Sequence, residues 1–108
     1  MDQERRQGPR FSFIATAEVM EEKSEARIAT RVSELSLRGC YLDMMNPFPS
    51  NTLVLVKIWE GANYFEGHGK MAYVQEHLGA GVSFLKIEDK YLQILQNWLK
   101  ELERKTNL

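Results

Sequence analysis

The N-terminal third of the chain alternates between apolar and polar residues. From Phe11 to Val19 every second side chain is apolar, and the residues between them are mostly polar. This period of two is typical of a strand with one buried face. After the charged segment Glu21–Glu25, the residues Ile28, Thr30 and Val32 line one face of a second segment with the same period. The pattern therefore predicts two successive strands joined by a charged turn.

Four further segments have the composition of strands and are separated by short polar turns. They are Cys40–Met44, Leu53–Trp59, Tyr64–Gln75 and Ala80–Leu85. The segment Leu53–Trp59 is apolar on both faces, which predicts a central strand. Gly67 and Gly69 lie inside the next segment and predict a bulge or a sharp bend of a barrel there.

The period changes after Ile87. Apolar residues then recur at steps of three and four, which predicts an amphipathic helix over 89–104. Its apolar stripe contains Leu95, Trp98 and Leu102 and is expected to be core, although an uncovered part of it could bind a partner. Strands followed by one helix, without long crossover connections, predict a mainly β fold: a six-stranded antiparallel β-barrel over 11–87 with a C-terminal α-helix.

The composition is that of an ordinary globular domain. The 108 residues are 44% hydrophobic and 27% charged, which fits a single domain over 1–108. A single cysteine, Cys40, excludes an internal disulfide and favours a reducing compartment. No apolar signal segment follows Met1, and the longest apolar stretch is too short to span a bilayer. We therefore expect a cytoplasmic protein that does not insert into a membrane.

Positive charge is concentrated near the N-terminus. The net charge of -1 argues against a binder of nucleic acid polymers, but Arg5, Arg6 and Arg10 lie within ten residues of the start. Guanidinium groups form paired hydrogen bonds with phosphate and with the O6/N7 edge of guanine, and they stack on purine faces. Residues 1–10, which we call the strap, could be only a solvated tail. Together with a Ser/Gly turn at Glu34–Gly39, they favour a site for a compact anionic purine nucleotide.

Three short motifs support this interpretation. The first is RQGPR from Arg6 to Arg10, the second is ELSLRG over Glu34–Gly39, and the third is GAGVSF over Gly79–Phe84. In this order they resemble the PilZ family, bacterial receptors for cyclic di-GMP, whose signatures are an RxxxR strap and a [D/N]xSxxG turn. The third motif is similar to the strand that closes the family's barrel. The resemblance covers nearly the whole chain and implies a single PilZ-like domain.

The resemblance also implies roles for individual residues. Arg6 and Arg10 would contact phosphate and guanine of cyclic di-GMP. Ser36 would hydrogen-bond through its hydroxyl, and Gly39 would let the backbone approach the ligand closely. Glu34 stands where the family has Asp or Asn, and its carboxylate could accept from the N1–H and N2–H₂ donors of guanine.

Arg5 bears on the stoichiometry of the complex. In PilZ domains, an arginine immediately before RxxxR is associated with a stacked pair of cyclic di-GMP molecules. The resemblance therefore implies two nucleotides per chain, because a further guanidinium supplies charge and stacking surface for a second dianion.

Two functions remain open at this point. The first is a cyclic di-GMP receptor that orders its strap over the nucleotide and signals to an unidentified effector protein. The second is a degenerate PilZ-like module that contacts proteins without binding nucleotide. The complete RxxxR motif favours the first function, and Glu34 favours the second.

An enzyme is not expected, and no cofactor is expected besides the nucleotide ligand. His68 and His77 are separated along the chain and have no partner at the spacing of metal ligands. Cys40 lies in an apolar strand, where a cysteine is usually a small buried hydrophobe. His68 is predicted to be an exposed histidine on a strand.

Overall fold

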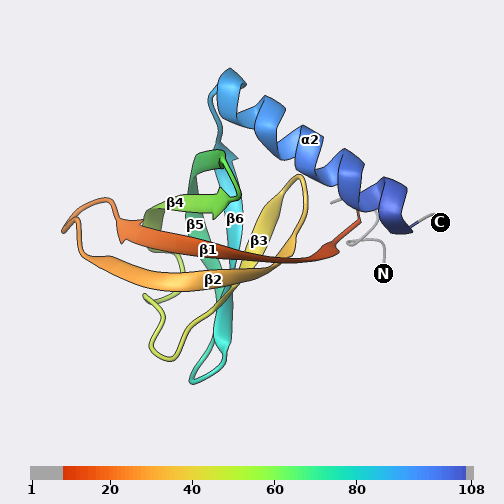
Figure 1. Cartoon of the computed structure of the whole chain (residues 1–108). Helices are drawn as coiled ribbons and strands as arrows, with labels where there is room; N and C mark the ends of the chain where they lie inside the picture. The colour runs from red at the N-terminus through yellow and green to blue at the C-terminus, as the bar shows by residue number, and fades with distance from the viewer. Residues whose placement is uncertain (1–8, 107–108) are drawn as a thin grey trace.

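The computed structural model describes residues 9–106. Within that range, six strands and one helix follow one another along the chain: β1 (Phe11–Glu21), β2 (Arg27–Leu35), β3 (Gly39–Asp43), β4 (Leu53–Glu60), β5 (Asn63–Gln75), β6 (Gly79–Lys86) and α2 (Asp89–Thr106). Neighbouring strands are antiparallel and close into a barrel in the order β1-β2-β3-β6-β5-β4 (Figure 1). The predicted antiparallel barrel with a C-terminal helix is confirmed.

The inward-facing residues of all strands form one hydrophobic core. In β1 the buried side chains are Ala15, Ala17 and Val19, as the alternation predicted. The strand β4 differs from the prediction, because only one of its faces is buried and Leu53 and Trp59 are exposed. It pairs with β1 and β5 along its two edges, as a barrel strand must, but its outer face does not lie against a second layer.

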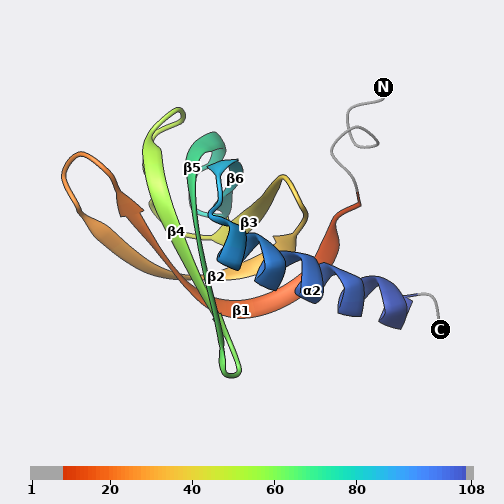
Figure 2. The same cartoon turned by 90° about the horizontal axis from the view of Figure 1, so that it is seen from above.

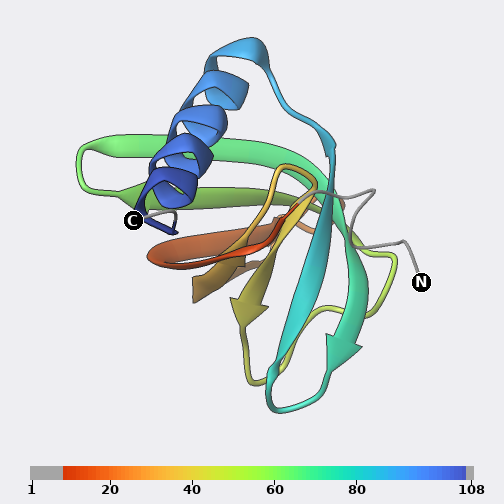
Figure 3. The same ribbon diagram turned by 90° about the vertical axis from the view of Figure 1, so that its right-hand side faces the viewer.

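The helix α2 lies across one end of the barrel, against β5 and β1 (Figures 1 and 3). Leu95 and Trp98 are its buried residues, which confirms that this part of the apolar stripe is core. The Trp98 ring lies 5.1 Å from the ring of Phe13 and 6.2 Å from that of Phe65, measured between centroids. Figure 2 shows the helix running past the N-terminal part of β1, where Phe13 lies. The helix therefore covers the end of the barrel next to the entry of the chain into β1.

The pairing of the strands is irregular at several places. The pairing of β5 with β6 shifts register between His68 and Gly69 and again between Met71 and Tyr73. The first shift lies at the predicted bend, where a Cβ on Gly69 would stand 2.4 Å from the carbonyl oxygen of Ser83. The pairing of β2 with β3 shifts between Val32 and Glu34. Each shift adds a residue to one strand and so changes which side chains point outward.

Candidate functional site

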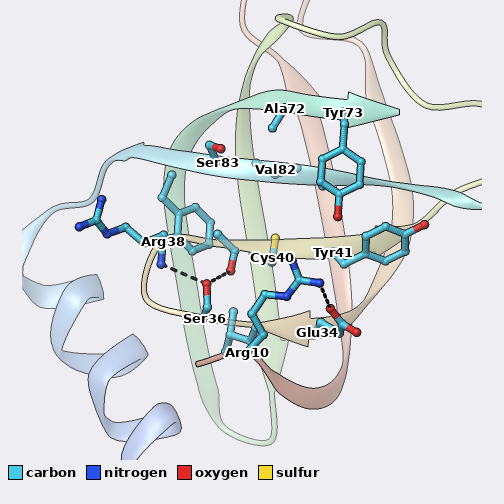
Figure 4. Close-up of a pocket in the computed structure, with 14 residues that line it drawn as sticks. Arg10, Glu34, Ser36, Arg38, Cys40, Tyr41, Ala72, Tyr73, Val82 and Ser83 are labelled. Carbon is cyan, nitrogen blue, oxygen red and sulfur yellow. Dashed lines mark hydrogen bonds and ion pairs between the residues drawn. The ribbon is translucent and has the colours of Figure 1, made fainter. Parts of the chain in front are cut away.

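The predicted site residues that the structure describes meet in one groove on the outer side of the barrel (Figure 4). All four of them line it, although Arg10 directly precedes β1, Glu34 lies near the end of β2, and Ser36 and Gly39 lie in the turn and at the first residue of β3. Arg5, Arg6 and the rest of the strap before Pro9 lie outside the described residues. The full lining consists of Arg10, Glu34, Leu35, Ser36, Arg38, Gly39, Cys40, Tyr41, Ala72, Tyr73, Gly81, Val82, Ser83 and Phe84.

Glu34 points outward because of the irregularity in β2. Alternation from Ile28 and Val32 would turn position 34 toward the core, but Ser33 is an extra residue in the pairing with β3. Leu35 is buried in its place, and Glu34 reaches the groove. A bulge of this kind is a common way to redirect a side chain beside a functional site.

Arg10 and Glu34 form an ion pair at the edge of the groove. The Arg10 Nη2 atom lies 3.2 Å from Glu34 Oε1, and the two side chains are 51% and 46% exposed. The sequence predicted that both would contact a ligand, but not that they would contact each other. An ion pair this exposed contributes only about 0–1 kcal/mol to stability, so an incoming anion can displace the carboxylate at small cost.

Ser36 holds the turn between β2 and β3. Its backbone N–H donates to the carbonyl oxygen of Gly39 at 2.9 Å, and its hydroxyl donates to the same oxygen at 3.3 Å. The backbone N–H of Arg38 in turn donates to the Ser36 hydroxyl at 3.2 Å. Serine is common in such turns because its short side chain bonds the backbone a few residues on. The buried Ser36 therefore shapes the groove, whatever else its hydroxyl contacts.

Gly39 is needed for the contact between two strands. A Cβ at this position would stand 2.1 Å from the carbonyl oxygen of Val82 in β6. No side chain fits such a gap, since its neighbour is backbone. Packing within the barrel therefore requires glycine at position 39, in addition to the close approach of a ligand that was expected from the sequence.

Sequence reasoning named four of the lining residues and missed the others, among them Arg38, Tyr41 and Tyr73, whose side chains can contact a ligand. Arg38 is exposed in the turn, inside the second motif but at one of its variable positions. Tyr41 lies two residues after Gly39, and alternation along β3 could have placed it on the same outer face. Burial raises the pKa of Tyr41, and the nearby Tyr73, Asp43 and Glu34 raise it further. The hydroxyl of Tyr41 donates to Gln75 Oε1 at 2.5 Å.

Neither an ionised thiol nor a cluster of metal ligands lies at the groove within the described part of the chain. Cys40 is buried, and burial raises the pKa of its thiol to about 12, so the thiol is protonated at neutral pH. This is the small buried hydrophobe that the sequence predicted. Residues 9–106 contain no group of three or more His, Cys, Asp or Glu side chains able to hold a metal ion. His68 is exposed as predicted, and its Nδ1 lies 2.9 Å from Glu22 Oε2.

No helix among the described elements is long and apolar enough to cross a membrane.

Comparison with known proteins identifies one family. The model of the PilZ domain matches residues 4–101. No curated protein sequence matches the chain. The PilZ domain of CeSA from a cellulose-synthesizing bacterium has the same fold, with a TM-score of 0.71 and 13% identity over 89% of this chain and 99% of that one.

Two further solved structures are similar. The PilZ domain of YcgR from Escherichia coli, a structure with c-di-GMP, has a TM-score of 0.73 and 16% identity over 95% of each chain. The Bacillus subtilis inhibitor of motility MotI has a TM-score of 0.76 and 17% identity over 96% of this chain and 53% of that protein. This chain therefore spans about half the length of MotI. At these identities the likeness shows the shared fold.

Proposed function

Because this chain belongs to the PilZ domain family, we propose that it is a cyclic di-GMP receptor that signals to a partner protein. The family assignment confirms the resemblance seen in the three motifs. PilZ domains are receptor domains, and the family that matches the chain is not a catalytic one. The PilZ domain of YcgR has been solved with c-di-GMP. The observation that carries the proposal is the convergence of Arg10, Glu34 and the Ser36–Gly39 turn on one groove.

The ion pair between Arg10 and Glu34 gives the proposal a mechanism. A phosphate of the nucleotide replaces the Glu34 carboxylate at the Arg10 guanidinium, where charge-assisted hydrogen bonds are strong. The released carboxylate then accepts from the N1–H and N2–H₂ donors of a guanine. Ser36 stabilises the turn, and Gly39 has no side chain and packs closely on β6. The ligand can therefore approach the backbone of the sheet at this point. Binding thus exchanges one exposed ion pair for two contacts with the ligand.

The strap completes the proposed site. We expect Arg5 and Arg6, which lie outside the described residues, to reach the nucleotide from the side of Arg10, and residues 1–10 to order over it. The newly ordered strap would present a surface that an effector protein recognises. Hydrogen exchange tests this directly: amide protection across Arg5–Arg10 should rise when cyclic di-GMP is added. Equal protection with and without nucleotide would contradict ordering of the strap.

The stoichiometry follows from Arg5. We expect two nucleotides per chain, since Arg5 adds a guanidinium beside the RxxxR motif. Titration calorimetry should give a ratio near two for the parent and near one for an Arg5→Leu variant. A ratio of one that is unchanged by Arg5→Leu would refute the second nucleotide and leave the first intact.

A second candidate function is a module that contacts proteins without binding nucleotide. It is favoured by Glu34, which replaces the Asp or Asn of the family motif and forms an ion pair with Arg10. Calorimetry separates the two candidates. Cyclic di-GMP should bind, whereas GTP and cyclic AMP at the same concentrations should bind far more weakly. Absence of heat with all three nucleotides, in a folded sample, would favour the protein-contact module.

A further inference from the structure

A row of residues that contains two tyrosines outside the family motifs, Tyr41 and Tyr73, crosses the outer face of the barrel from Glu34. Strand register makes Glu34 in β2 the partner of Tyr41 in β3, and Tyr41 the partner of Gly81 in β6. Gly81 is in turn the partner of Tyr73 in β5. The row thus sets the Tyr41 ring beside Glu34 of the proposed nucleotide site and the Tyr73 ring on the other side of Gly81, and all four residues line the same groove.

Tyr73 joins this row only because β5 is irregular. Alternate residues from Phe65 to Met71 are buried, and regular continuation would send Tyr73 into the barrel. Ala72 is an extra residue in the pairing with β6, so Tyr73 points outward and is 43% exposed. Large aromatic side chains are normally buried where the fold allows it. The bulge therefore places on the surface a ring that the strand pattern would otherwise bury.

Two glycines form a floor for the rings. A Cβ on Gly81 would stand 2.2 Å from Cε1 of Tyr73, and a Cβ on Gly79 would stand 2.8 Å from the hydroxyl oxygen of Tyr41. Because Gly79 and Gly81 carry no side chain, both rings can lie against this part of β6. Figure 4 shows the Tyr73 ring reaching from β5 across β6 toward β3. The inner side of the ring is covered, so its exposure falls on the outer side.

Contacts fix the orientation of the pair. The ring centroids of Tyr41 and Tyr73 are 6.3 Å apart with an interplanar angle of 36°. The hydroxyl of Tyr41 is held by Gln75, as described above. A ring that is already oriented loses little conformational freedom when a flat ligand stacks on it. Tyr41 is therefore held in place beside Tyr73, and Tyr73 itself lies on Gly81, so the pair offers an oriented surface to a planar partner.

We propose that Tyr73, lying on Gly81 and flanked by Tyr41, is a stacking platform for a purine base of the nucleotide held by Arg10 and Glu34. This inference rests on the proposed function and names a further ligand-binding residue of the same site, one that contributes affinity. The chemistry favours a base over a phosphate, because an aromatic face attracts another π face and carries no donor for an anion. Stacking accepts any purine, so the platform supplies affinity while the Glu34 carboxylate distinguishes guanine from adenine.

Substitution of the ring tests the platform. Calorimetry with cyclic di-GMP should show Tyr73→Ala binding about 10-fold more weakly than the parent, while Tyr73→Phe, which keeps the ring, stays within about 3-fold. If the parent and Tyr73→Ala bind equally while Arg10→Ala loses binding, the platform is wrong and the proposed function stands. If the parent itself does not bind cyclic di-GMP, both are wrong.

A double-mutant cycle separates the ring from the barrel. Gly81→Ala pushes against Tyr73, since the three nearest atoms to its Cβ all belong to that ring. It should therefore weaken binding several-fold in the parent but leave the affinity of the Tyr73→Ala protein unchanged. Circular dichroism establishes that each variant is folded. An equal loss of affinity in both backgrounds would show that Gly81→Ala acts by disturbing the barrel and not by displacing the Tyr73 ring. That result would contradict the proposed support of Tyr73 by Gly81.

Discussion

At the scale of single residues, the ion pair between Glu34 and Arg10 decides how this domain would meet a nucleotide. Glu is one methylene and one rotatable bond longer than the Asp of the family motif, which costs about 0.5–1 kcal/mol when the side chain is held in place. We therefore expect Glu34→Asp to tighten binding of cyclic di-GMP by roughly 3-fold. Calorimetry measures this, with the exposed Glu103 of α2 changed to Asp as the control.

Removal of the carboxylate should have the opposite effect. Glu34→Ala frees Arg10 from an exposed ion pair worth at most about 1 kcal/mol, but it loses charged hydrogen bonds to guanine worth about 1.5–3 kcal/mol. Because the lost hydrogen bonds outweigh the freed arginine, the dissociation constant should rise. If neither substitution of Glu34 changes the dissociation constant while Arg10→Ala does, Glu34 does not touch the ligand.

The thiol of Cys40 should be inert in the folded protein. Its pKa of about 12 leaves roughly 1 thiol in 10,000 ionised at pH 8, and the thiolate is the nucleophile. We expect slow reaction with Ellman's reagent in buffer at pH 8, faster reaction as the pH rises, and immediate reaction in denaturing urea. Equal rates in buffer and in urea would mean that the thiol is open to solvent.

At the scale of strands, the contact between β3 and β6 depends on Gly39. Its added Cβ would meet the backbone of Val82, so Gly39→Ala should destabilise the fold by about 1–3 kcal/mol or more. Gly61 is a suitable control, because space is open around it and only its φ of 61° penalises a side chain, by about 1–2 kcal/mol. Urea unfolding compares the two variants. A Gly39→Ala protein as stable as the parent would contradict the packing described here.

The strands also show what the sequence can predict. Alternation predicted β1 and its buried face, and the change of period predicted α2. Both predictions were possible because an element with one buried face shows a period of apolar residues within its own sequence. The bulges at Ser33 and Ala72 could not be predicted, because an extra residue is defined only by the partner strand. For this reason Tyr73 was missed as a lining residue.

The same limit applies to the candidate site. The motifs predicted that Arg10, Glu34, Ser36 and Gly39 belong together, and all four line the groove. They did not predict the ion pair of Arg10 with Glu34, which depends on a choice between rotamers in the folded protein. Nor did they predict that Ser36 is engaged within its own turn.

At the scale of the whole molecule, the helix closes the core at one end of the barrel. Trp98 packs against Phe13 of β1 and Phe65 of β5, so Trp98→Ala should cost about 3–5 kcal/mol of unfolding free energy. The exposed neighbour Gln96 provides the control, and Gln96→Ala should stay within about 0.5 kcal/mol. Urea unfolding followed by circular dichroism reports both. A Trp98→Ala protein as stable as Gln96→Ala would show that the helix is not part of the cooperative core.

The central claim is that the groove around Arg10 binds cyclic di-GMP. Calorimetry on Arg10→Ala tests it most directly, beside the parent and an Arg27→Ala control that removes an exposed arginine elsewhere on β2. Arg10 is exposed and carries little of the core, so the variant should remain folded. We expect the parent and Arg27→Ala to bind alike, and Arg10→Ala to bind at least about 10-fold more weakly. A folded Arg10→Ala protein that binds cyclic di-GMP as tightly as the parent would contradict the assignment of this groove.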